Sequence, residues 1–197
     1  MRLIMMLVLT GLLVFPGTAQ EGNWQADAIE RAILFHKENL PEGCQALDNA
    51  DLQPAHFELQ VGEETAARQA LMIEFPCRIG AYNMTSVFLL SDQHGKVTEP
   101  FFPSPQIKVV YEDETESTIV DDIIITGTEN LREVVNATFD SSTRSVTERN
   151  KWRGLGDAYS VTKWGYKQGK FEIMYFAVDA SFDGEDNPKT LMDIDIW

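Results

Sequence analysis

The stretch 151-KWRGLGDAYSVTKWGYKQGKFEI-173 decides the fold, because it places two turns on either side of an apolar, β-branched and aromatic segment. The first turn, 154–157, contains two glycines that permit a tight reversal, and a salt bridge or backbone hydrogen bonds of Arg153 and Asp157 would fix it. The second, 167–170, is a polar tetrad with a glycine between apolar runs, which predicts a four-residue hairpin loop. The stretch therefore predicts consecutive strands of an antiparallel sheet.

The rest of the chain repeats this pattern, with one exception near the beginning. Apolar residues between 24 and 35 recur every three or four positions, and Pro41 and Gly43 follow, which predicts one N-terminal helix. Beyond it, short β-branched and aromatic runs between Gly, Asn, Asp and Ser clusters indicate a mainly β fold of antiparallel sheets, sandwich or barrel-like. The run 171–178 is apolar on both faces, which favours the middle of a covered sheet. The predicted strands are 56–61, 70–77, 85–91, 96–102, 106–111, 118–126, 133–140, 143–149, 159–166, 171–178 and 191–197.

The first 19 residues have the pattern of a secretory signal peptide. Arg2 precedes an apolar run that ends at Phe15, and the small residues Gly17 and Ala19 stand where signal peptidase requires them. The run is shorter than the about 20 residues that span a membrane, which disfavours the alternative of an uncleaved anchor. We expect cleavage after Ala19, a single mainly β domain over 20–197 without a membrane span, and a periplasmic or secreted location.

Cys44 and Cys77 are the two cysteines of the chain. In an oxidising compartment such a pair normally forms a disulfide, and closing this loop stabilises the fold by about 3 to 4 kcal/mol. The alternative is a redox or metal-binding thiol pair. It is disfavoured, because there is no CxxC motif and no histidine at ligand spacing.

The chain is strongly acidic, with 31 Asp and Glu against 16 Lys and Arg and a formal net charge of −15. Removal of the leader takes away Arg2 and no acid, so the mature chain is more negative still. The negative electrostatic field of such a chain repels nucleic acid and attracts a cationic protein or peptide. The alternative is that the excess of acids only keeps the protein soluble. The acidic cluster 112–122 has two interpretations: a binding surface for a basic partner, or a loop whose charges are only solvated.

No catalytic motif accompanies the opening stretch. His36, His56 and His94 stand outside any catalytic or HExxH context, and there is no GxSxG elbow, Walker loop or GxGxxG motif. We therefore expect no cofactor, with one reservation for calcium in the loop 179–186.

That loop resembles the calcium loop D-x-[DN]-x-[DN]-G over its first half only. Asp179, Asp183 and Asp186 are the candidate metal ligands, but Thr190 stands where a bidentate Glu is needed and Pro188 interrupts the second half. A calcium site of another type and an acidic hairpin loop remain the two interpretations.

Two motifs together carry a family resemblance. The first is 74-EFPCRIGAYN-83, and the second is 153-RGLGD-157 followed by Trp164, Gly169 and Phe171. Over about residues 40 to 197 they resemble the bacterial envelope family known as domain of unknown function 1176. The resemblance implies an exported, mainly proteobacterial protein with no assigned reaction.

This chain departs from the family pattern at several positions. Ala158 stands where the family has a cysteine, and no cysteine occurs near 179–183, where its later cysteine is expected. The joint absence indicates that a second disulfide is dispensable here. Trp152 replaces a family glycine and Tyr166 replaces a family tryptophan, which alters any aromatic platform.

If the motifs form a functional site, their polar residues Arg78, Tyr82, Asn83, Arg153 and Asp157 are its candidates. Alternatively, Tyr82 and Asn83 close a turn beside the disulfide. Three hypotheses follow: a non-catalytic binding or inhibitor-type protein of the envelope with an acidic surface, an enzyme that uses Asp157 with Arg153 or Tyr82, and a calcium-binding module that uses the 179–186 loop. The sequence predicts no oligomeric state.

Overall fold

The structure is a computed structural model, and it describes residues 24–39, 44, 54–61, 68–113, 115 and 118–195. The predicted signal peptide, residues 1–19, lies outside the described residues. The described chain begins with the helix α1 (Trp24–Glu38), which confirms the one predicted helix. The strands are β1 (Ala55–Val61), β2 (Arg68–Ile79), β3 (Met84–Asp92), β4 (Val97–Thr98), β5 (Phe102–Tyr111), β6 (Val120–Leu131), β7 (Glu133–Val135), β8 (Thr138–Asp140), β9 (Ser145–Lys151), β10 (Tyr159–Lys167), β11 (Lys170–Asp179) and β12 (Lys189–Asp193).

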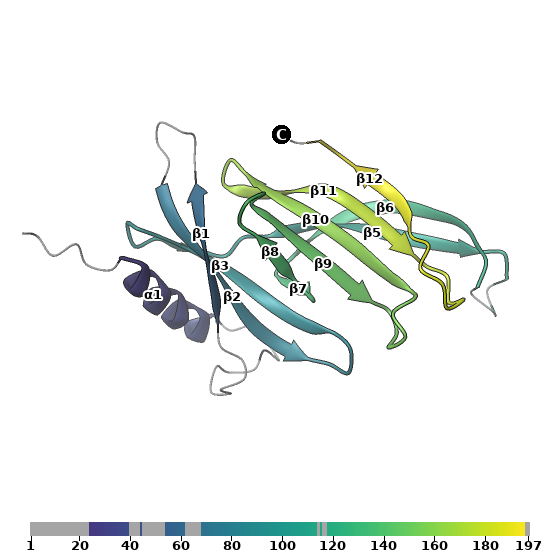
Figure 1. The fold of residues 1–197 in the computed structure, drawn as a ribbon, viewed down its shortest axis with the longest axis horizontal. Helices are drawn as coiled ribbons and strands as arrows, with labels where there is room; N and C mark the ends of the chain where they lie inside the picture. Colours follow the sequence, from purple (N-terminus) through teal and green to yellow (C-terminus); the bar gives the residue numbers. More distant parts are fainter. Residues whose placement is uncertain are drawn as a thin grey trace, which may run out of the picture.

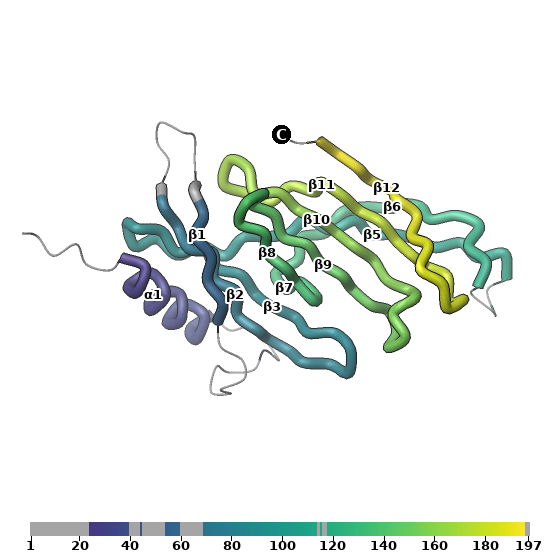
Figure 2. Tube along the Cα trace, viewed as in Figure 1, coloured from purple at the N-terminus to yellow at the C-terminus, as the bar shows by residue number. Residues whose placement is uncertain are grey.

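The strands form three antiparallel sheets, which confirms the predicted fold class. The N-terminal sheet has the order β1-β2-β3-β4, with β7 also paired to β3, and the C-terminal sheet has the order β12-β11-β10-β9-β8. The third is the β5–β6 hairpin. Each sheet has a first and a last strand, so the described strands form packed open sheets rather than a closed ring. Figures 1 and 2 show α1 beside β1–β3 at one end of the molecule and the long β5–β6 hairpin reaching toward the other.

One face of the C-terminal sheet packs against both other sheets. Trp164 on β10 is directly opposite Ile173 on β11, and Thr162 is opposite Phe176, so these side chains share a face. Near Trp164 this face contacts the N-terminal sheet. Near Phe176 the same face contacts Ile123 of the β5–β6 hairpin. The fold is therefore a sandwich in which the N-terminal sheet and the β5–β6 hairpin both pack on one face of the C-terminal sheet.

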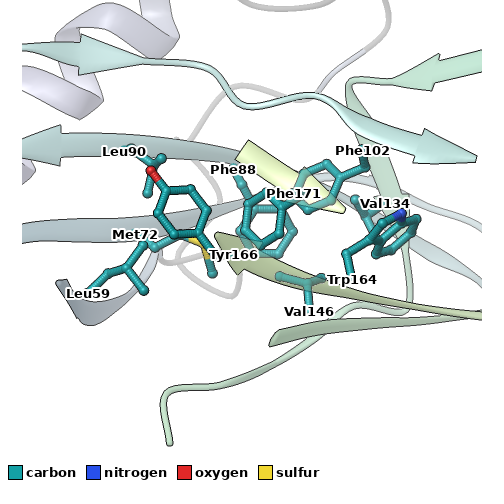
Figure 3. Close-up of a cluster of buried hydrophobic side chains, with 10 residues drawn as sticks. All are labelled: Leu59, Met72, Phe88, Leu90, Phe102, Val134, Val146, Trp164, Tyr166 and Phe171. Carbon is teal, nitrogen blue, oxygen red and sulfur yellow. The ribbon is translucent and has the colours of Figure 1, made fainter. Parts of the chain in front are cut away.

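The core between the N-terminal and C-terminal sheets is aromatic. The Phe102 ring stacks on Phe171 with 4.5 Å between ring centroids, and it meets the edge of Trp164 at 5.1 Å. The Trp164 indole N–H also donates to the Pro103 carbonyl over 2.6 Å, which satisfies the one polar atom of this fully buried side chain. Figure 3 shows the ten buried residues of this cluster: Leu59, Met72, Phe88, Leu90, Phe102, Val134, Val146, Trp164, Tyr166 and Phe171.

The opposite face of the N-terminal sheet is covered by α1. Alternate residues Leu71, Ile73 and Phe75 of β2 pack against Ala28 and Ala32 of the helix. Small helical residues let the helix approach the sheet closely. The layer order over this part of the molecule is therefore helix, N-terminal sheet, C-terminal sheet.

The disulfide between Cys44 and Cys77 is present, as predicted. Cys77 is fully buried and packs with Val87 of β3, so the bridge fastens the segment that follows α1 to the end of β2. The hairpin predicted at 167–170 is also present, but its loop is shorter than predicted. Lys167 pairs with Lys170, which leaves a two-residue turn in which Gln168 and Gly169 both have positive φ angles of 51° and 88°. Positive φ at both central positions matches the right-handed twist of the strands, and a longer loop is not needed.

The predicted strand 133–140 is interrupted. Asn136 adopts a positive φ of 44° and separates β7 from β8, which belong to different sheets. Asparagine tolerates this left-handed conformation better than most residues, because its short side chain can bond nearby backbone groups. The predicted strand 96–102 is also divided between two sheets. Its first part forms β4 of the N-terminal sheet, and its last residue begins β5 of the hairpin.

Candidate functional site

The structure brings the two sequence motifs together. The first motif ends in the β2–β3 turn, residues 79–83, and the second forms the β9–β10 turn, residues 152–157. The Tyr82 hydroxyl lies 3.3 Å from the Trp152 carbonyl oxygen, and a Cβ atom at Gly154 would lie 3.5 Å from the Tyr82 ring. Both turns lie at the same end of the sandwich in Figure 1. We call these two turns together the motif surface.

Asn83 connects the two turns through its side-chain amide. Its Nδ2 donates to the Lys151 carbonyl over 2.8 Å, and its Oδ1 accepts a hydrogen bond of 2.8 Å from Asn136 Nδ2. Asn136 Nδ2 also donates to the Arg149 carbonyl, and Asn136 Oδ1 accepts the Met84 N–H, each over 2.9 Å. The two asparagines therefore join the N-terminal sheet to β9. The alternative that Asn83 closes a turn is compatible with this role, because Gly80 N–H donates to the Asn83 carbonyl over 2.7 Å.

Arg153 and Asp157 form a bidentate ion pair within the β9–β10 turn. Arg153 Nε donates to Asp157 Oδ1 over 2.7 Å, and Nη2 donates to Oδ2. The Gly184 N–H also donates to Oδ2 over 2.9 Å, which fastens the β11–β12 loop to this turn. The Arg153 guanidinium holds the pKa of the Asp157 carboxyl well below its usual range, with further help from backbone N–H donors. The tight turn has Gly156 at a positive φ of 78°.

Arg78, the fifth candidate, has a different partner. Its Nη2 forms an ion pair with Glu133 Oε1 on β7, and Glu133 Oε2 accepts the Thr85 hydroxyl over 2.9 Å. Among the described residues, the hydrogen bonds and ion pairs of Arg78 do not join it to the motif surface. The structure thus assembles Tyr82, Asn83, Arg153 and Asp157 around two turns and leaves Arg78 on a separate contact.

The three candidate metal ligands in the β11–β12 loop have separate partners. Asp179 is 2 % exposed, and its two oxygens accept the Ser181 hydroxyl at 2.7 Å and the Asn187 N–H at 2.8 Å. Asp183 accepts the Glu185 N–H over 2.9 Å.

Asp186 Oδ1 accepts a hydrogen bond from the Tyr159 hydroxyl, and Asp186 Oδ2 lies 3.9 Å from Arg149 Nη2. The Arg149 guanidinium also lies 3.7 Å above the centre of the Tyr159 ring. The burial of Tyr159, with the hydrogen bond to Asp186, raises the pKa of that phenol to about 12. Across the part of the chain that the structure describes, no three His, Cys, Asp or Glu side chains are grouped for a metal ion.

A pocket of about 350 Å³ lies between this loop and the start of β6. Its lining includes the carboxylates of Asp121, Asp179 and Asp183 together with Lys189. Lys189 Nζ also forms an ion pair of 3.1 Å with Asp122, which lowers the pKa of that carboxyl. Of the predicted acidic cluster 112–122, Glu114 and Glu116 lie outside the described residues.

The motif surface exposes large apolar side chains. Leu155 is 73 % exposed, Ile79 56 % and Tyr82 41 %. Next to them, the Phe182 ring of the β11–β12 loop is 6.4 Å from Trp152, and the Arg153 guanidinium lies 5.1 Å from the Phe182 ring. The surface therefore combines exposed apolar groups with polar groups that are held in place by internal hydrogen bonds.

Glu148 and Asn136 were not predicted from the sequence. Glu148 on β9 is 4 % exposed, it accepts the Val135 N–H over 2.9 Å, and burial raises its pKa to about 6. It lies directly opposite Thr162, whose buried hydroxyl has no hydrogen-bond partner among the described residues. A single carboxyl within a polar strand gave no local signal of this burial.

These features define a class of protein: an antiparallel β-sandwich with one disulfide, whose loops at one end build a surface around paired sequence motifs. The chain belongs to the family described as protein of unknown function (DUF1176), whose model matches residues 18–184. This confirms the resemblance that the two motifs carry. Comparison with curated proteins and with solved structures finds no match. Among the described helical residues, no segment has the length and hydropathy needed to cross a membrane.

Proposed function

We propose that this protein is a non-catalytic binding or inhibitor-type protein of the bacterial envelope. Its partner is a cationic protein or peptide, and the motif surface makes the contact. The observation that carries the proposal is the composition of this surface. Its polar side chains are engaged internally, while Ile79, Tyr82 and Leu155 are exposed on a frame of hydrogen bonds. Large exposed apolar residues on a rigid support are typical of binding surfaces.

The state of Asp157 supports binding over catalysis. A general base near neutral pH needs a pKa close to that pH and a free lone pair directed at the substrate. Asp157 accepts hydrogen bonds on both oxygens, its pKa is lowered and its side chain is only 4 % exposed, so it is a weak base with little access to solvent. The alternative enzyme hypothesis requires Asp157 to give up these partners.

The charge of the chain supports a cationic partner. The formal net charge is −15, and exposed acids on the β11–β12 loop, Asp183, Glu185 and Asp186, adjoin the motif surface. Such a field accelerates encounter with a positively charged protein and repels anionic ones. The disulfide and the leader-like N-terminal sequence support an envelope location, because disulfides persist in oxidising compartments.

The test measures binding of the purified mature chain to a panel of basic proteins that includes lysozymes, at low and at high ionic strength. The double variant Tyr82→Ser/Leu155→Ser is compared with the control Leu34→Ser, since Leu34 on α1 is also exposed, at 54 %. We expect the double variant to lose at least about tenfold in affinity for a bound partner, which corresponds to about 1.4 kcal/mol. The control should bind as the unmodified protein does.

Three outcomes would count against the proposal. One is that no basic protein binds at low ionic strength. Another is that the double variant binds as well as the control. The third is that an activity is found which Asp157→Asn abolishes while that variant keeps its fold, because this would favour the enzyme.

A further inference from the structure

The edge strands of the sandwich differ in how well they are protected. The C-terminal sheet ends in β8 and β12, of three and five residues, and the N-terminal sheet ends in β1, of seven, and in β4 and β7, of two and three. Short edges offer few unpaired backbone groups to another strand. On the β5–β6 hairpin, β5 carries Pro103, Pro105 and Lys108, which are residues that discourage further pairing.

β6 is long and has neither proline nor a basic residue, and its only edge protection is a bulge at Asp121 and another at Thr126. It is twelve residues long, and β5 is its only strand neighbour among the residues that the structure describes. Six of the seven residues from Ile124 to Asn130 are exposed. In an antiparallel pair, alternate residues direct their N–H and C=O groups away from the partner. Between the two bulges of β6 and beyond Thr126, over 122–125 and 127–131, the outer side of the strand is therefore a row of backbone donors and acceptors that another strand can use.

The side chains of β6 indicate which strand would fit. Ile124 and Ile125 are 43 % and 42 % exposed and, being adjacent, point to opposite faces of the hairpin. Asp121, Asp122 and Glu129 make the strand acidic, and the strand itself contains no basic residue, although Lys189 of β12 pairs with Asp122. Opposite charges across two strands stabilise the pair and like charges destabilise it.

A second copy of this chain fits poorly. In the antiparallel register that would pair all twelve residues of β6 with another β6, Asp122 stands opposite Glu129 twice. The charges thus discourage self-association and favour a basic strand.

We propose that β6 is a strand acceptor. It adds to the β5–β6 hairpin an extended segment of another protein in which Lys or Arg alternate with β-branched residues. The added strand would bond to the outer backbone groups of β6, place its cations near Asp121 and Glu129, and cover Ile124 and Ile125. This site is separate from the motif surface and does not depend on the proposed function.

The test uses the full mature chain and a synthetic peptide, Lys-Val-Thr-Val-Lys-Val-Thr-Val-Lys, with blocked ends. Its control is the same peptide N-methylated at every internal residue, which keeps the charge and side chains but removes the backbone donors. We expect the control to bind at least about tenfold more weakly, because strand addition depends on main-chain hydrogen bonds. Hydrogen exchange should show new protection within 120–131 when the unmethylated peptide is bound.

Two charge reversals on the same hairpin locate the site. Glu129→Lys lies on β6, whereas Glu112→Lys is an equally exposed acid in the β5–β6 turn. We expect Glu129→Lys to weaken peptide binding at least about fivefold and Glu112→Lys to change it less than about twofold. The Tyr82→Ser/Leu155→Ser variant should bind the peptide as the unmodified chain does.

The proposal is overturned if both charge reversals weaken binding equally, because the peptide would then respond only to the general field. Equal binding of the N-methylated peptide, or protection confined to the motif surface, overturns it as well. So does concentration-dependent protection of 120–131 without peptide, accompanied by dimers in sedimentation, since the occupant would then be a second copy.

Discussion

The polar side chains at the motif surface and those between the layers have opposite surroundings. Asp157 at the motif surface accepts hydrogen bonds from Arg153 and from Gly184, and these bonds hold its pKa low. Glu148, inside the sandwich, accepts one hydrogen bond, from Val135, and burial raises its pKa to about 6. His36, between α1 and the N-terminal sheet, is 3 % exposed, and its Nε2 has no hydrogen-bond partner in the part of the chain that the structure describes.

This difference separates two contributions to stability. At the motif surface, charged and amide groups gain partners on folding, so their removal leaves other polar groups unsatisfied. Between the layers, titratable groups lose water and gain little in return, so they oppose folding whenever they are charged. The polar motif residues therefore hold the two turns of the motif surface in place. The buried titratable groups make the free energy of unfolding depend on pH.

Replacement of Asn83 by Ala should have the largest effect. The change removes the hydrogen bond to the Lys151 carbonyl and one of the two hydrogen bonds of Asn136 Nδ2, and each lost hydrogen bond costs about 1 kcal/mol. We expect a loss of about 2 to 3 kcal/mol in the free energy of unfolding, measured by urea denaturation. The control is Asn39→Ala, since Asn39 donates one exposed bond to the Phe35 carbonyl at the end of α1. Equal losses in both variants would contradict the framing role of Asn83.

Replacement of Glu148 by Gln should stabilise the protein, but only above a certain pH. The folded pKa of about 6 lies above the ordinary value of 4.5, so the folded state retains the proton and stability falls as the pH rises from about 4.5 through about 6. Gln cannot ionise and can still accept the Val135 N–H. We expect a gain of up to about 2 kcal/mol at pH 8 and almost none at pH 4.5, measured by urea unfolding at both values.

The control for Glu148→Gln is Glu172→Gln, since Glu172 is a more exposed carboxyl on β11 that pairs with Lys170. It should lack the gain at high pH. A destabilised Glu148→Gln protein at pH 8 would mean that the carboxylate has a partner that the hydrogen bonds described above do not include.

The fold was more predictable from the sequence than the site was. The helix, the hairpin at 167–170 and the disulfide depend on local spacing or on the only two cysteines, and all of them are present. The Gln168-Gly169 turn was predicted as a hairpin but with the wrong length, because the choice between two and four loop residues depends on the twist of the flanking strands.

The candidate site depends on contacts between distant parts of the chain, and single residues do not signal them. Asn83 and Asn136 are 53 positions apart, and nothing near either indicates that they bond. The burial of Glu148 likewise depends on β7 and β10 covering it. What the sequence did indicate was that the two motifs matter together, and their turns lie side by side in the structure.

A smaller effect of the opposite sign is expected for His36. Its ring stacks on Phe75 with 4.4 Å between centroids, and burial lowers its pKa, although the charge of Glu99 acts against this. Because the unfolded state binds the proton more tightly, stability is complete above the unfolded pKa of about 6.5 and declines as the pH falls below it. His36→Phe keeps the stacking and should remove this decline between pH 7 and pH 5. A decline of equal slope in the variant, followed by urea unfolding, would assign it to other groups.

The smallest effect is expected from calcium. Adding it tests whether the carboxylates of the β11–β12 loop, like Asp157 at the motif surface, are held by hydrogen bonds within the protein. Asp179 already accepts hydrogen bonds on both oxygens, and Asp183 and Asp186 have separate partners, so a cation must displace bonds that stabilise the loop. We expect the melting temperature to be the same in calcium and in chelator. A ligand present at a hundredfold over its Kd stabilises a folded protein by about 2.7 kcal/mol, which is easily measured. A rise that Asp183→Asn removes would instead show that the loop rearranges around a cation, and its internal bonds would then describe only the metal-free state.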